Sequence, residues 1–254
     1  MSENVKNLWL TPFKKIRIFS YESLPSTNLS AKEYAATHAS DAVIVAKGQT
    51  AGRGRLGRSF ASDFGAGIYM SILIHPKKSI SDTLKLTALA GVAVCRAIEK
   101  NTELNPKIKW VNDIQVQGKK VSGILAEGGF GTDGVLDYAV VGIGLNVLKR
   151  DFGELSEIAG ALGDFTQNLP DMEKLTRDIV REFYRIYGLR EHSAELEYYR
   201  SHSSVIGKDI TVYRAAESYP ARAIDINGDF ALVVNDGEKE SAISSAEVSV
   251  RVSK

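Results

Sequence analysis

The sequence predicts an α+β fold: a mixed β-sheet with flanking helices, followed by a small C-terminal β-barrel. Strand-like apolar runs alternate with helical patterns through the first two hundred residues. After about His202 the pattern changes to short alternating runs with hairpin turn signals. We therefore expect a large unit over residues 1–204 and a small one over 205–254, in close contact because no low-complexity linker separates them.

The first elements follow one another closely. KIRIFSY alternates like a half-buried strand, and after a proline turn Ser26, Thr27 or Asn28 can cap the helix LSAKEYAATHA. DAVIVAK, from Asp41, and GIYMSILI, at 67–74, are predicted strands separated by a segment rich in glycine and arginine. The strand DAVIVAK therefore leads directly into the glycine-arginine segment and sets the direction in which that segment leaves the sheet.

The remaining elements are two long helices and two groups of strands. SDTLKLTALAGVAVCRAIEK, capped by Ser81, and the amphipathic DMEKLTRDIVREFYRIYGL are the helices. The central strands are IKW, VSGILAE and VLDYAVVGIGLNV, all rich in apolar or β-branched residues. The C-terminal strands are GKDITVYRA, YPARAIDIN, DFALVVN and AEVSVRV, with Asn227-Gly228 and Asp236-Gly237 as turn signals.

The composition is that of an ordinary globular protein. Lys and Arg number 32 against 31 Asp and Glu, so a general attraction to nucleic acid or anionic membrane is not expected. The single cysteine, Cys95, excludes an internal disulfide and, with only four histidines, a Cys/His zinc site. The N-terminus lacks a signal peptide and the longest nearly apolar run, 138–148, is too short to span a bilayer, so we expect a cytoplasmic protein without a membrane partner.

The segment AGRGRLGR, residues 51–58, allows several interpretations. Its glycines satisfy the G-x-G-x-x-G dinucleotide pattern, but a strand follows where that motif needs a helix, and no Gly-Lys-Ser/Thr triplet of a Walker loop occurs. A nucleic-acid patch with Phe60 and Phe64 is an alternative, although one basic loop is a poor footprint for a polymer. A solvated hairpin would explain the arginines but not the glycines. The combination favours a loop that closes around a small anion.

Other polar clusters follow strands. KWVND, 109–113, places a cation, an aromatic ring, an amide and a carboxylate at a strand end, and the QGKK turn brings Lys119 and Lys120 back beside it. Apolar residues crowd Lys120, and a nearly buried lysine paired with an aspartate indicates a functional site. GIGLNV, 142–147, adds an amide on a strand whose glycines allow close approach.

Five motifs resemble, in order and approximate spacing, those of the biotin protein ligases: STN at 26–28, Gln49 with GRGRLGR at 52–58, KWVND, KKVSGIL with Lys120, and GIGLN. The resemblance runs from about Phe13 to the end and implies a class II synthetase/biotin ligase-like sheet with an SH3-like barrel. Two positions differ: the family usually has proline at Val111 and often tryptophan at Phe60. The second difference weakens the implied stacking on adenine.

The resemblance implies an ATP-dependent ligase. Such an enzyme converts biotin to biotinyl-5′-AMP with release of pyrophosphate, then transfers the biotinyl group to one lysine of a biotin carboxyl carrier protein. ATP, Mg²⁺ and the substrate biotin are thus the implied ligands, and no covalent enzyme intermediate is required. A homodimer is also implied, since dimers are common in the family.

Matching positions imply three sets of site residues. The catalytic set is Lys120, Arg53 and Arg55. The biotin-binding set is Ser26, Thr27, Asn28, Gln49, Gly52, Arg53, Gly54, Arg55, Lys120 and Gly123. The ATP and adenylate set is Arg53, Arg55, Arg58, Phe60, Asn112, Asp113 and Asn146, with no metal ligands predicted.

Two alternatives remain open from the sequence. A lipoate–protein ligase of related fold would activate a different acid in the same way, although its family's glycine-rich motif differs from GRGRLGR. A biotin-dependent DNA-binding repressor would need an N-terminal winged helix domain, and only about twenty-five residues precede STN. We therefore expect no specific DNA partner.

Overall fold

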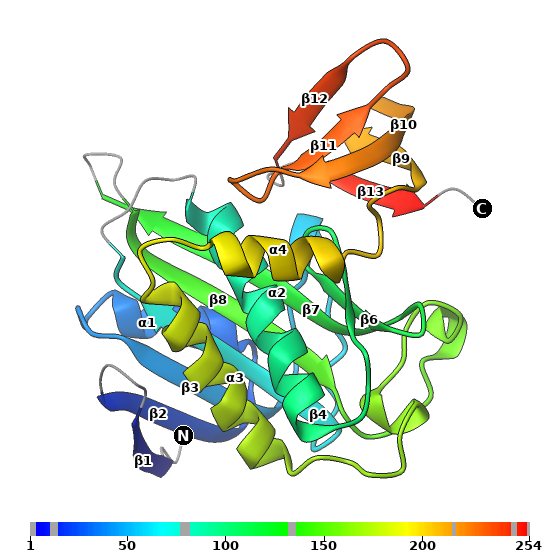
Figure 1. The fold of residues 1–254 in the computed structure, drawn as a ribbon. Helices are drawn as coiled ribbons and strands as arrows, with labels where there is room; N and C mark the ends of the chain where they lie inside the picture. The colour runs from blue at the N-terminus through cyan, green and yellow to red at the C-terminus, as the bar shows by residue number, and fades with distance from the viewer. Residues whose placement is uncertain are drawn as a thin grey trace.

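The computed structural model shows an eight-stranded mixed sheet with helices on both faces and a five-stranded antiparallel sheet at the C-terminal end (Figure 1). The predicted α+β fold is confirmed. The residues that the structure describes are 4–10, 15–76, 82–131, 136–214, 217–244 and 248–252.

The large sheet has the strand order β1-β2-β3-β4-β8-β7-β6-β5. Its only parallel pair among these neighbours in the described part of the chain is β2 with β3. The strands are β1 (Asn4–Leu10), β2 (Lys15–Leu24), β3 (Ala42–Gln49), β4 (Gly67–Ile74), β5 (Lys107–Lys109), β6 (Asp113–Val116), β7 (Lys119–Phe130) and β8 (Leu136–Asn146).

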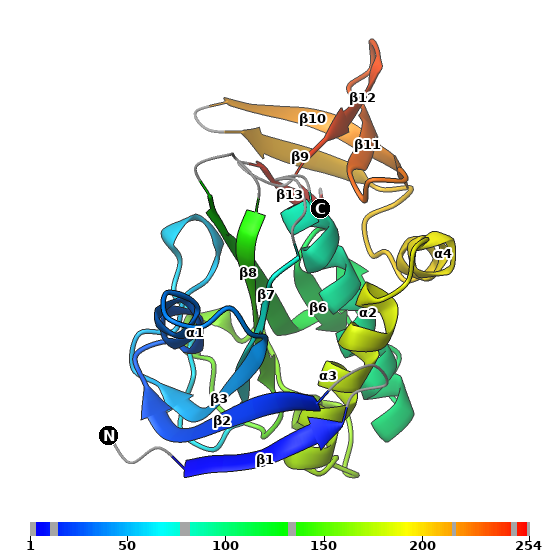
Figure 2. The same ribbon diagram turned by 90° about the vertical axis from the view of Figure 1, so that its left-hand side faces the viewer.

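Helices cover the large sheet from both sides, with α1 on one face and α2 and α3 on the other (Figure 2). The helices are α1 (Thr27–Ala35), α2 (Asp82–Asn101), α3 (Met172–Tyr187) and α4 (Ser193–Ser201). The described ranges also contain the short 3-10 turns η1 (Arg55–Gly57), η2 (Gly153–Leu155) and η3 (Leu162–Asp164). The two faces of the sheet therefore differ in what covers them.

The central strand β8 has apolar side chains on one face of the sheet and glycines on the other. Val141 and Ile143 are buried in the large apolar core beneath α2. Because side chains alternate along a strand, Gly142 and Gly144 point to the α1 face instead. There they leave room for other groups, which is why the cavity described below lies on that face.

The C-terminal sheet has the order β12-β11-β10-β9-β13 and lies at one end of the large sheet (Figures 1 and 2). Its strands are β9 (Asp209–Arg214), β10 (Glu217–Ile226), β11 (Leu232–Asn235), β12 (Glu240–Ile243) and β13 (Val248–Val252). Trp110 donates its ring N–H to the carbonyl of Phe230 at 3.1 Å, and Arg200 donates Nε–H to that of Ile226 at 2.8 Å. The two parts pack closely, while the boundary at 204/205 stays a prediction.

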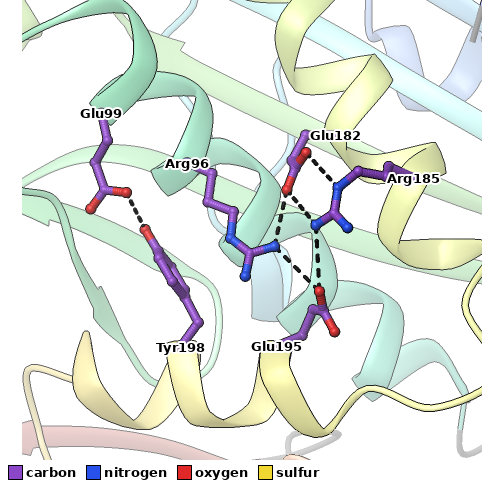
Figure 3. Close-up of polar contacts among 6 residues, drawn as sticks. All are labelled: Arg96, Glu99, Glu182, Arg185, Glu195 and Tyr198. Atoms are coloured by element: carbon purple, nitrogen blue, oxygen red, sulfur yellow. Dashed lines mark hydrogen bonds and ion pairs between the residues drawn. The ribbon is translucent and has the colours of Figure 1, made fainter. Parts of the chain in front are cut away.

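Helices α2, α3 and α4 are joined by a polar cluster (Figure 3). Arg96 on α2 donates to Glu182 on α3 at 3.0 Å and to Glu195 on α4 at 3.3 Å. Arg185 donates to both of these carboxylates, so two arginines share two acids. This arrangement satisfies Glu195, whose side chain is almost fully buried.

Among the α-helices and strands of the described residues, the sequence predicted most but not β1, β6, α4 or β12. Ser26 is the N-cap residue of α1, without a side-chain capping bond. Ser81, the predicted cap of α2, and Phe13 lie outside the described residues. None of the helices in the described ranges is both long enough and apolar enough to cross a membrane.

Candidate functional site

A cavity on the α1 face of the large sheet collects nearly every predicted site residue. Thirteen of them line it: Ser26, Thr27, Asn28, Gln49, Arg53, Gly54, Arg55, Arg58, Phe60, Asn112, Asp113, Lys120 and Gly123. Gly52 and Asn146 are not among its lining residues. Segments separated by almost a hundred residues thus converge on one site.

One end of the cavity is built from amides and hydroxyls. The Oε1 atom of Gln49 accepts from the backbone N–H of Thr27 at 2.8 Å. Its Nε2 donates to Ser62 at 2.8 Å, and Ser62 donates to the carbonyl of Phe60 at 3.0 Å. Partners of opposite polarity fix which way the Gln49 amide faces.

Asn28 is held equally firmly at the same end. Its Oδ1 accepts from the buried hydroxyl of Ser71 at 2.6 Å, while its Nδ2 donates to Glu127 at 2.8 Å and to the carbonyl of Leu125 at 3.3 Å. Its side chain lies directly over Gly142, with no room for a Cβ there. Both amide hydrogens are therefore engaged, and Oδ1 is the atom with a lone pair left for a ligand.

Glu127 supplies negative charge beside this polar end. Lys32 forms an ion pair with it at 2.6 Å, and Nη1 of Arg53 lies 4.0 Å away. Burial by itself would raise the pKa of Glu127, but the hydrogen bonds from Lys32 and Asn28 outweigh it and lower the pKa. The carboxylate is therefore ionised at neutral pH.

The other end of the cavity is cationic. Nζ of Lys120 lies 2.6 Å from Oδ1 of Asp113, and Arg55 donates to Oδ1 of Asn112 at 3.1 Å. Burial lowers the pKa of Arg55, an effect that Asp113 opposes and Arg58 reinforces. An anion entering here would meet several positive charges held near one another.

The backbone distinguishes Lys120 from its neighbour. Lys120 donates its N–H to the carbonyl of Ile158 at 2.8 Å and accepts from the N–H of Gly160 at 2.9 Å, which fixes its main chain. Lys119 instead donates Nζ–H to the carbonyl of Ser156 at 2.6 Å and is not a lining residue. Of the two lysines, only Lys120 therefore lines the cavity.

The glycine-arginine segment forms a hairpin. Arg53 pairs with Ser59, the N–H of Gly54 donates to the carbonyl of Arg58 at 2.7 Å, and that of Phe60 donates to Gly52 at 2.9 Å. A Cβ at Gly52 would lie 2.7 Å from the hydroxyl of Ser62, and closer still to the carbonyl of Phe60. Gly52 therefore shapes the hairpin from outside the cavity.

No dinucleotide-binding helix follows this hairpin. The turn η1 contains Leu56 at φ 55° and ends at Gly57, at φ 72°, and the next element along the chain is the strand β4. The aromatic ring of Phe60 then lies against the sheet: a Cβ at Gly144 would come within 2.7 Å of its Cζ. The small residues of β8 therefore make room for this ring.

Several site residues were missed from the sequence. Ser71 carried a signal, since a hydroxyl in the otherwise apolar strand GIYMSILI needs a partner. The sequence around Glu127 and Lys32 gave no such signal, because their ion pair forms only where α1 packs near β7. The C-terminal sheet also contributes Val250 and Arg251 to the cavity lining, across a sequence distance that no local pattern spans.

The described part of the chain contains no group of three or more His, Cys, Asp and Glu side chains suited to a metal ion. The carboxylate of Asp113 lines the cavity, but Lys120 engages it. A protein-only magnesium site is thus not formed by these side chains. An ion accompanying a nucleotide would be held largely by phosphates and water, the usual environment of Mg²⁺.

The chain belongs to the biotin/lipoate A/B protein ligase family, whose sequence profile it matches over residues 20–146. It is thus an enzyme of the ligase class, as predicted. It is 32% identical to the bifunctional ligase/repressor BirA of Bacillus subtilis over 90% of this chain and 72% of that protein. It is 27% identical to the biotin–[acetyl-CoA-carboxylase] ligase of Mycobacterium tuberculosis over 93% and 89% of the two chains.

Solved structures give the same result. The biotin protein ligase from Aquifex aeolicus in complex with biotin and ATP superimposes with a TM-score of 0.80 at 26% identity, covering 93% of this chain and 99% of that one. The biotin ligase-like fold predicted from the motifs is therefore confirmed. The roles of individual site residues stay predictions.

Proposed function

We propose that this protein activates biotin with ATP and transfers the biotinyl group to a lysine of a biotin carboxyl carrier protein. One observation carries the proposal: a single cavity joins an end lined by fixed amides and hydroxyls to an end lined by Arg55 and Lys120. A small acid with a polar ring can bind at the first end and present its carboxylate to the second. The Aquifex aeolicus relative was solved with biotin and ATP, which supports both ligands.

The polar end favours biotin over lipoate. The ureido group of biotin has two N–H donors and a carbonyl acceptor, whereas the dithiolane ring of lipoate has neither. Oδ1 of Asn28 is left as an acceptor by its partners, and it can receive one ureido N–H. An apolar ring offers no donor to this oxygen, so biotin gains a hydrogen bond there, worth about 0.5–1.5 kcal/mol, that lipoate cannot form.

In the first step, a carboxylate oxygen of biotin attacks the α-phosphorus of ATP. A new P–O bond forms, the bond to the β-phosphate breaks, and pyrophosphate leaves with its electron pair. Two anions must meet and charge grows on the α-phosphate, so Lys120, Arg53 and Arg55 would stabilise the transition state. Phe60 would stack on adenine, and Arg58, Asn112 and Asp113 would position the nucleotide.

In the second step, the neutral amine of the carrier lysine attacks the acyl carbon of biotinyl-5′-AMP. The new amide forms, AMP leaves with the electron pair of the cleaved C–O bond, and the amine loses a proton to solvent. Lys120 would stabilise the oxyanion that develops at the acyl carbon. Neither step requires a covalent bond to the enzyme.

The wider proposal keeps the expectations from the sequence. Mg²⁺ would arrive with ATP, the acceptor would be a biotin carboxyl carrier protein, and the catalytic unit would span 1–204 with the small unit at 205–254. We also propose a cytoplasmic homodimer that binds no specific DNA.

The test is pyrophosphate release from ATP and Mg²⁺ in the presence of biotin, lipoate or neither acid. We expect biotin-dependent release that excess lipoate does not inhibit. Release with lipoate at an equal or greater rate would show that the lipoate alternative is correct. Release that does not depend on either acid would exclude both activities.

A further inference from the structure

Arg150 lies four residues beyond the end of β8 and outside the cavity, yet its side chain is only 13% exposed. Its guanidinium donates to Oδ2 of Asp63 at 2.5 Å and to the carbonyl of Ala61 at 3.2 Å. It also donates to Oδ1 of Asn146 at 3.2 Å and stands 4.6 Å from the centre of the Phe152 ring. Contacts on this scale hold a guanidinium in one orientation.

The contact with Asn146 fixes the direction of an amide. Oδ1 of Asn146 accepts from Arg150, and its Nδ2 donates to the carbonyl of Gly160 at 3.1 Å. The two sides of an amide have similar shapes, so partners of opposite polarity are needed to select one orientation. Each side keeps one further hydrogen-bonding position, an acceptor on Oδ1 and a donor on Nδ2.

Asn146 lies next to the nucleotide end of the proposed site. Gly142, Gly144 and Asn146 share one face of β8, because they are two residues apart. Asn28 lies over Gly142 and the ring of Phe60 over Gly144. A base stacked on Phe60 would therefore bring its edge toward Asn146.

Adenine and guanine differ at that edge. Adenine presents the N6 amine, a donor, beside the acceptor N7, and an asparagine amide pairs with both. Guanine presents two acceptors there, O6 and N7. An amide held in one direction can therefore accept from adenine N6 through Oδ1 and donate to N7 through Nδ2. With guanine, the same Oδ1 would face O6, and two acceptor oxygens repel each other.

We propose that Arg150 is a positioning residue that makes the nucleotide end selective for adenine, by fixing the amide of Asn146. The proposal rests on the function proposed above. The segment after Phe60 anchors Arg150 through Ala61 and Asp63, and Arg150 in turn orients Asn146. Without the guanidinium, only the hydrogen bond to the carbonyl of Gly160 opposes rotation, so the amide turns more readily and can donate to guanine.

Arg96 provides a matched control. It is a second largely buried arginine, with a side chain 25% exposed and two carboxylate partners, Glu182 and Glu195 (Figure 3). It lies on α2, which covers the opposite face of the sheet from α1 (Figure 2), and it is not among the residues that line the cavity. Its replacement should lower stability without affecting the choice of base.

The experiment measures biotin-dependent pyrophosphate release with ATP and with GTP, for the wild type, Arg150→Met, Arg150→Lys and Arg96→Met. We expect the ratio of kcat/KM for ATP to that for GTP to fall at least about tenfold in Arg150→Met. The KM for biotin should stay within twofold, since Asn28 and Gln49 have their own anchors. Arg150→Lys should be intermediate because an ammonium lacks the planar fork.

Two results would overturn the inference: an unchanged nucleotide ratio in active Arg150→Met, or an equal fall in Arg96→Met. If Arg150→Met does not fold, as thermal unfolding would show, the ratio in Arg150→Lys decides the question. A wild type without biotin-dependent release would instead overturn the proposed function, and the inference with it.

Discussion

Gly142→Ala tests the polar end of the cavity at its most crowded point. A Cβ at residue 142 would lie 2.8 Å from Cγ of Asn28 and 3.0 Å from its Nδ2, and closer still to Oδ1. Asn28 cannot move aside freely, because Ser71 and Glu127 hold its amide from two directions. The added methyl must therefore break or distort at least one of these hydrogen bonds.

The cost follows from how buried these groups are. Asn28 is 4% exposed and Ser71 fully buried, so a polar atom that loses its partner there is not reached by bulk water. Each such loss costs about 1–3 kcal/mol. A displaced Asn28 also loses its proposed contact with biotin, and one contact of this size, at about 1.4 kcal/mol per tenfold change, weakens biotin binding by roughly 5- to 150-fold.

The assay is titration calorimetry with biotin, with Gly91→Ala as the control. Gly91 lies in α2, and the nearest atoms to a Cβ there are 3.8 to 3.9 Å away, which is an ordinary contact. The control should bind biotin normally and gain up to about 1 kcal/mol of stability from helix propensity. Biotin affinity within threefold of the wild type in folded Gly142→Ala would refute the proposed placement of biotin beside Asn28.

Three further outcomes are expected. Lys120→Ala should lower the rate of adenylate formation by about 10²- to 10³-fold and Lys119→Ala by much less, as measured by quenched-flow; equal losses would remove the assignment to Lys120. The pKa of Glu127 is lowered in the folded protein, so the stability that its ionised form provides is present at neutral pH and is lost as the pH falls below 4.5. Denaturant unfolding should therefore show the free energies of unfolding of the wild type and Glu127→Gln converging at acidic pH. A difference that stays constant with pH would contradict this. Trypsin should cleave at the arginines of the hairpin 52–58, and biotin with ATP should slow this cleavage more than biotin alone; identical rates would mean that the hairpin does not engage ligand.

The sequence was informative where chemistry is local. Glycines among arginines after a strand, and Lys120 at a turn beside KWVND, pointed to the cavity because each motif occupies a few consecutive residues. The strong periodicity of α2 and α3 likewise identified these helices. In contrast, the sequence predicts no element for the short strand β6 (Asp113–Val116), because four residues are too few for a clear alternating pattern.

What the sequence could not supply were contacts between distant elements. Arg150 meets Asp63 and Ala61 only after β4 and β8 have paired. Glu127 meets Lys32 only once α1 lies on the sheet. These residues have no local signature, since an arginine or glutamate after a strand is usually solvated.

The most direct test of the proposed function is mass analysis after incubation with ATP, Mg²⁺ and isotopically labelled biotin, with and without a biotin carboxyl carrier domain. We expect labelled biotinyl-5′-AMP in the absence of the carrier. With the carrier added, we expect one biotinyl group on a single carrier lysine, together with AMP and pyrophosphate. A carrier that stays unlabelled with no adenylate formed, while the enzyme remains folded and ATP is present in excess, would contradict the proposal that the cavity joins biotin to ATP.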